Sequence, residues 1–91
     1  MSESQAEPTA EQVVEELRKL KVSDMLASSA SMFASLAYGK LAPDVRDLDE
    51  ARLAIDALRA LLPLMPEDHR RDIQEVVANL QLAYADAAKS E

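Results

Sequence analysis

The chain has 91 residues, no cysteine and a formal net charge of −7 at pH 7. This length limits it to one domain, and the lack of cysteine excludes disulfides and thiolate metal sites. An acidic surface repels phosphate backbones and anionic lipid heads, so we expect neither nucleic acid nor membrane as a partner. A basic protein partner remains compatible with this charge.

Many of the apolar residues are small. Sixteen of them are alanine, and the aromatic residues are one Phe and two Tyr. Alanine favours helix but buries little area, so the core of a single chain should be thin. Small domains of this kind often gain stability from a second chain, and we therefore expect self-association.

Residues 1–8 are polar and acidic, and we expect them to form a disordered tail. They do not resemble a signal peptide or a basic targeting sequence. The longest uncharged run, residues 25–39, is shorter than the roughly 20 apolar residues that a membrane span needs. These features predict a soluble cytoplasmic protein.

The first predicted helix covers about residues 9–20. Thr9 and Gln12 have the spacing of a capping box, and Val13, Leu17 and Leu20 form one apolar stripe. This stripe predicts a short amphipathic helix that packs on the other helices or reaches a neighbouring chain. The alternative is a segment that becomes ordered only on binding, because short isolated helices are unstable.

The second predicted helix covers about residues 24–38, with Ser23 as its N-cap. Gly39, the only glycine, fits the left-handed position that closes a helix. No glycine or proline separates residues 9 and 38, so the first two helices could also form one kinked rod. Small residues at four-residue spacing, such as Ala30 and Ala34, allow close helix contact, either between subunits or within an ordinary core.

The third predicted helix, about residues 47–62, has Asp47 as N-cap and Glu50 as its capping-box partner. Its apolar arc covers more than half of the circumference, so it needs neighbours on two sides and should be central. The remaining side is a charged ridge, consisting of Asp49, Arg52, Asp56 and Arg59. This ridge is either an exposed ladder of ion pairs or a partly buried set of polar contacts that fixes the register of an interface.

The last predicted helix covers about residues 67–87 and follows Pro63, which ends or kinks the third helix, and Pro66, which suits its first turn. Its apolar residues repeat every three or four positions, as in a coiled-coil seam. They are Ile73, Val76, Val77, Leu80, Ala83, Tyr84 and Ala87. The short connection predicts an antiparallel hairpin of the third and fourth helices, and residues 88–91 should be frayed.

Two sequence patterns carry a family resemblance. They are Asp47-Leu48-x-x-Ala51-Arg52-x-x-Ile55-Asp56-x-Leu58 and Leu80-x-x-x-Tyr84. Together with the second helix they resemble the bacterial family named domain of unknown function eighteen-forty-four, over about residues 22–87. That family usually has a longer loop where this chain has residues 40–46. The resemblance implies a small cytoplasmic bacterial helical protein and carries no active site across. Some members are encoded near translation genes, which gives a translation-associated role as one alternative.

The sequence offers little support for catalysis. His69 is the only histidine, beside Asp68 and Asp72. Helical di-iron sites and catalytic zinc sites use two or more histidines, so we expect a solvated residue rather than a metal or acid–base site. We predict no enzyme activity, no cofactor and no metal.

Our leading hypothesis is an all-α bundle of three to four helices, single-domain over residues 9–87, that forms a homo-oligomer, most simply a dimer. Its candidate interface residues are Arg52, Asp56, Ile55, Met32, Phe33, Leu36, Val77, Leu80 and Tyr84. The first alternative is a monomeric adaptor that binds a basic partner helix. A second alternative is a bundle that binds a small molecule among Met25, Met32, Phe33 and Tyr84. We favour it less, because Met and aromatic residues at helical spacing more often form plain core.

Overall fold

Four α-helices and two short 3₁₀ turns make up the computed structural model, which describes residues 9–90. The α-helices are α1 (Ala10–Lys19), α2 (Val22–Lys40), α3 (Leu48–Leu61) and α4 (Glu67–Ser90). The 3₁₀ turns η2 (Pro43–Val45) and η3 (Leu62–Leu64) lie in the connections on either side of α3. The predicted all-α class with four helices is confirmed.

Two helix starts have the predicted caps. The Thr9 hydroxyl accepts from the Gln12 amide over 3.1 Å, and the Gln12 side chain accepts from the Thr9 amide over 2.9 Å, which completes the capping box. At the start of α3, Asp47 is the N-cap as predicted, and its carboxylate accepts from the Glu50 amide over 3.1 Å. The Asp47 amide donates to the Lys40 carbonyl over 2.7 Å instead of to the Glu50 side chain, so the predicted capping box is incomplete. Both caps depend on residues three positions apart, which is why the sequence alone predicts them.

The predicted ends of α2 were wrong. The helix begins at Val22 after Lys21, so Ser23 lies inside its first turn and is not the N-cap. Gly39 is also inside the helix, and no glycine among the described residues has a positive φ. The helix continues because Leu41 follows it into the core, where its side chain is buried and its amide donates to the Ala37 carbonyl.

Helix α4 is longer than predicted. It begins at Glu67, and the carbonyl of Pro66 accepts from the amides of His69 and Arg70, so Pro66 directly precedes the helix. It then runs to Ser90, so residues 88–90 are helical where frayed chain was expected. The predicted frayed residue 91 and the predicted disordered tail, residues 1–8, lie outside the described residues.

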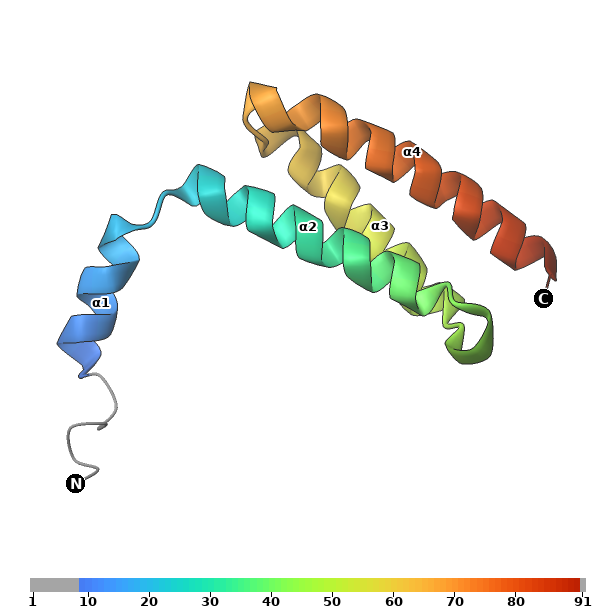
Figure 1. Cartoon of the computed structure of the whole chain (residues 1–91), viewed down its shortest axis with the longest axis horizontal. Coiled ribbons are helices and arrows are strands. Elements are labelled where there is room, and N and C mark those ends of the chain that lie inside the picture. The colour runs from blue at the N-terminus through green and yellow to red at the C-terminus, as the bar shows by residue number, and fades with distance from the viewer. Residues whose placement is uncertain (1–8, 91) are drawn as a thin grey trace.

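Helix α3 is the centre of the structure and contacts both α2 and α4, as its wide apolar arc predicted. In Figure 1 it lies between those two helices, and α4 turns back along it after η3. Its buried residues are Ala51, Ala54, Ile55 and Leu58. Around them lie buried residues of the other two helices and of the connections, namely Ala30, Ala37, Leu41, Met65, Val77, Leu80 and Ala87.

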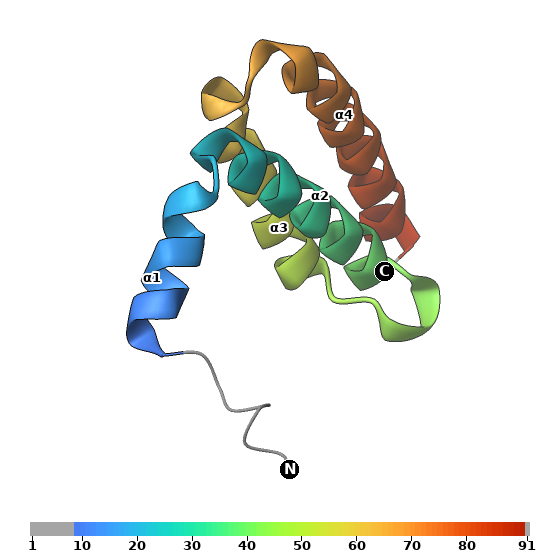
Figure 2. The same cartoon turned by 60° about the vertical axis from the view of Figure 1, so that its left-hand side comes forward.

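Helix α1 stands apart from the other three helices in Figures 1 and 2. It contains no buried residue. It is separate from α2, because Leu20 and Lys21 both have extended backbone angles, with ψ of 142° and 136°. The first two helices are therefore not one rod, and α1 does not pack on the core formed by α2, α3 and α4.

The molecule is thin. Its extents along the principal axes are 55 × 35 × 15 Å. Since packed helix axes lie about 8–10 Å apart, the shortest extent accommodates no more than two helix layers. No helix within residues 9–90 has the length and apolar character needed to cross a membrane.

Candidate functional site

The structure divides the nine predicted interface residues into three groups. Ile55, Val77 and Leu80 are buried among α2, α3 and α4 of their own chain, so they belong to the core of one subunit. The other six lie on two different surfaces. Met32, Phe33 and Leu36 lie on one, and Arg52, Asp56 and Tyr84 line the other.

The first surface, which we call the α2–α3 face, consists of Met32, Phe33, Leu36, Val45, Leu53 and Ala57. Two adjoining hollows share Leu36 and Lys40, and this makes the face continuous. Met32 is 66% exposed, Val45 65% and Leu53 63%, whereas Phe33 is half-buried against the core. Lys40 lines both hollows, and Glu50 lines one of them. The face is therefore an apolar area that includes one positive and one negative charge.

Helical spacing explains why these side chains are exposed. On α2, Ala30 and Ala37 are buried, and Met32 and Leu36 project from a different side of the helix. On α3, the buried positions are 51, 54, 55 and 58, and Leu53 projects away from them. Leu53 is one of the apolar residues of this helix, but no helix within residues 9–90 covers it.

The second surface is a groove between α3 and α4, lined by Arg52, Asp56, Arg59, Gln81 and Tyr84, with the buried Ile55 at its base. Asp56 and Arg59 form an ion pair of 3.8 Å, and their side chains are 54% and 58% exposed. An exposed pair of this kind contributes about 0–1 kcal/mol to stability. Within one chain the charged ridge is thus solvated. The prediction that it fixes an interface remains a prediction.

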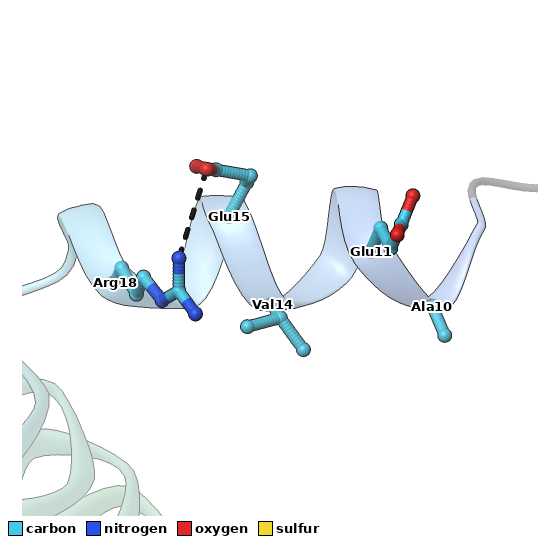
Figure 3. A pocket seen from close by; sticks show the side chains of 5 residues that line it. All are labelled: Ala10, Glu11, Val14, Glu15 and Arg18. Carbon is cyan, nitrogen blue, oxygen red and sulfur yellow. Dashed lines mark ion pairs between the residues drawn. The ribbon is translucent and has the colours of Figure 1, made fainter.

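The apolar stripe of α1 forms a third uncovered surface. Val13, Val14, Leu17 and Leu20 are all exposed. Figure 3 shows the side of the helix that carries Val14, which lies beside the Glu15–Arg18 ion pair of 3.8 Å. All five side chains drawn there come from this single helix, so they form an open face and not an enclosed binding site.

His69 lies in a hollow between α2 and α4, together with Asp72, Ser28 and Ser31. Its side chain is exposed. Across the described part of the chain, no three His, Asp or Glu side chains come together in a way that could hold a metal ion. The absence of catalysis and of a metal remains a prediction.

The residues proposed to bind a small molecule do not converge. Met32 and Phe33 line the α2–α3 face, whereas Tyr84 lines the groove between α3 and α4. Met25 is 48% exposed on α2. A ligand enclosed by all four side chains would need a different arrangement of the helices.

Two arginines that hold the connections in place were missed by sequence reasoning. Arg46 donates from Nε to the Leu41 carbonyl over 3.2 Å, and Arg70 donates from Nη2 to the Met65 carbonyl over 3.0 Å. Both acceptors are main-chain carbonyls in connections between helices, and periodicity carries no signal for such contacts. The contribution of these arginines to the site is indirect, since Arg46 holds the connection between α2 and α3, and Arg70 holds the connection between α3 and α4.

No family model, no curated protein and no solved structure matches this chain. The resemblance to the family named domain of unknown function eighteen-forty-four therefore remains a prediction from the sequence patterns.

Proposed function

We propose that this protein is a homo-oligomeric interaction module, most simply a dimer, without catalytic activity. The subunit would be a bundle of α2, α3 and α4, with an antiparallel α3–α4 hairpin. Its partner would be a second copy, and its place of action the cytoplasm. Nucleic acid and membranes would not be partners, because the net charge is −7.

One observation carries this proposal, namely the mismatch between a small core and a large uncovered apolar surface. The largest fully buried side chains are Leu58, Met65 and Leu80. Outside the core, the α2–α3 face and the stripe of α1 leave many large apolar side chains exposed. Apolar patches of this size on a soluble protein are typical of protein–protein interaction sites. A second copy would cover them and would add to the limited core.

The test is the mass of the full-length protein in solution. Sedimentation equilibrium between about 1 and 100 µM should give a mass of two chains, with reversible dissociation on dilution. A mass of one chain, 10.0 kDa, over that whole range would reject the homo-oligomer. That outcome would favour the second candidate, a monomeric acidic adaptor that binds a basic helix and has a translation-associated role as one possibility.

A further inference from the structure

We propose that the α2–α3 face is a two-fold interface with a second copy of the chain, in which Lys40 of one copy pairs with Glu50 of the other. This inference rests on the proposed function and identifies the surface through which the dimer forms. The two α2–α3 pairs would then form the centre of a four-helix bundle, with α4 of each copy on the outside.

The area of the face suits a dimer. Since Met32, Val45 and Leu53 are each about two-thirds exposed, the apolar side chains of the face present roughly 500 Å² on each copy. A standard protein–protein interface takes about 800 Å² from each partner, much of it from a polar rim. The apolar side chains together with Ser35, Gly39, Lys40 and Glu50 around them come close to that area.

The chain's own first helix cannot cover the whole of this face. Only Leu20 and Lys21 separate α1 from α2. If α1 folded back along α2, its 10 residues would extend about 15 Å. It would therefore end beside Met32. Leu36 lies beyond that point, since it is about 21 Å along the helix from Val22. Helix α1 therefore cannot cover the whole face, which leaves room for another molecule.

The charges of the face favour a second copy as that molecule. Each copy has a net charge of −7, so two copies repel each other at most orientations. Among the residues that line the two hollows of this face, however, the charged ones are one Lys and one Glu, so their charges balance. In a two-fold interface each contact occurs twice, so Lys40 of each copy can meet Glu50 of the other. The face is thus complementary to itself in both apolar area and charge.

The first experiment introduces a charge into the face. Leu53→Glu should weaken dimerisation by about 100-fold, because dimer formation would bury an unpaired carboxylate. Leu53 is exposed in the single chain, so the monomer should keep its fold, which circular dichroism measures. The matched control is Leu82→Glu on α4, where Leu82 is 67% exposed and lies outside the face. This control should remain dimeric.

The second experiment tests the pairing of Lys40 with Glu50 between copies. The Lys40→Glu variant has two carboxylates on the face, and the Glu50→Lys variant has two ammonium groups. Each variant alone should dimerise about 10-fold more weakly than the parent, because like charges meet across the axis. An equimolar mixture should form heterodimers with close to the parental affinity. Native mass spectrometry separates these heterodimers when one variant is isotopically labelled.

The outcomes distinguish the inference from the proposed function. A parent protein that is monomeric at 100 µM overturns both. A dimeric parent whose Leu53→Glu variant stays dimeric overturns this inference alone and leaves the homo-oligomer in place. If Leu17→Glu on α1 dissociates the dimer as strongly as Leu53→Glu does, the face binds the α1 stripe of the other copy, and the two-fold pairing of α2–α3 faces is rejected. Formation of heterodimers in the mixture of the Lys40→Glu and Glu50→Lys variants supports the two-fold pairing of α2–α3 faces.

Discussion

The guanidinium of Arg46 connects the loop after α2 to the far end of the chain. Its Nη1 donates to the carbonyl of Ala87 over 3.4 Å. Ala87 lies in the last turn of α4, where helix carbonyls lack partners within the helix. Two segments 41 residues apart in the sequence are thereby held together by one part-buried side chain.

Replacing Arg46 should therefore destabilise the fold without affecting any apolar contact of the core. We expect Arg46→Met to lower the free energy of unfolding by about 1.5 kcal/mol, since charged donors to carbonyls contribute about 1.5–3 kcal/mol. The melting temperature should fall by about 6–12 °C. Arg71→Met, at an exposed position of α4, is the control and should change the melting temperature by less than about 2 °C. Equal shifts in both variants would contradict the role of Arg46.

The charged ridge on α3 should contribute little to the stability of the fold or to dimerisation. Because the Asp56–Arg59 pair is more than half exposed, we expect Arg59→Ala to change stability by less than about 0.5 kcal/mol. Arg52→Glu should likewise leave the dimer intact, since Arg52 lines the groove towards α4 and not the α2–α3 face. Urea unfolding measures the first effect and sedimentation the second. Dissociation by Arg52→Glu would instead place the interface at the ridge.

Gly39 offers a route to a more stable protein. It lies in the last turn of α2 with an ordinary negative φ, and a Cβ built on it meets nothing within 4 Å. Gly39→Ala should thus raise the stability of the monomer by about 0.5–1 kcal/mol, by reducing the freedom of the unfolded chain. Thermal unfolding of dilute protein measures this gain. Because Gly39 lines a hollow of the α2–α3 face, the dimer affinity should be measured beside it.

Leu80 and Leu82 form a matched pair, two residues apart on α4. Leu80 is fully buried, and Leu82 is 67% exposed. Leu80→Ala should cost about 3 kcal/mol, enough to unfold a large fraction of so small a protein, because it leaves a cavity among the three helices. Leu82→Ala should cost less than about 0.5 kcal/mol. Urea titration followed by circular dichroism at 25 °C measures the free energy of unfolding of both variants. Similar losses of stability in the two would contradict the assignment of Leu80 to the core and Leu82 to the surface.

The sequence predicted those parts of the fold that depend on near neighbours. Thr9 and Asp47 accept from amides three residues on, so their caps follow from local spacing alone. The wide apolar arc of α3 required two neighbours, and α2 and α4 supply them. Gly39 misled the prediction because a glycine can either close a helix or continue it. Here the helix continues through Gly39, because Leu41 is buried in the core against residues distant in sequence.

The candidate site was less predictable. Periodicity identified Met32 and Leu36 together with Ile55 and Leu80 as apolar helix residues, but it could not separate those covered by this chain from those left exposed. That separation depends on which sides of α2 and α3 face each other. The amphipathic stripe of α1 posed the same question, since it indicates that a partner is needed and does not say which.

Alanine contributes five of the eleven buried apolar residues within residues 9–90, and this has a calorimetric consequence. The heat capacity change of unfolding scales with the apolar area that becomes exposed, and alanine exposes little. The isolated subunit should therefore have a shallow stability curve, whose free energy of unfolding varies little with temperature. Association through the α2–α3 face would add apolar area, so the heat capacity change per chain should increase with protein concentration.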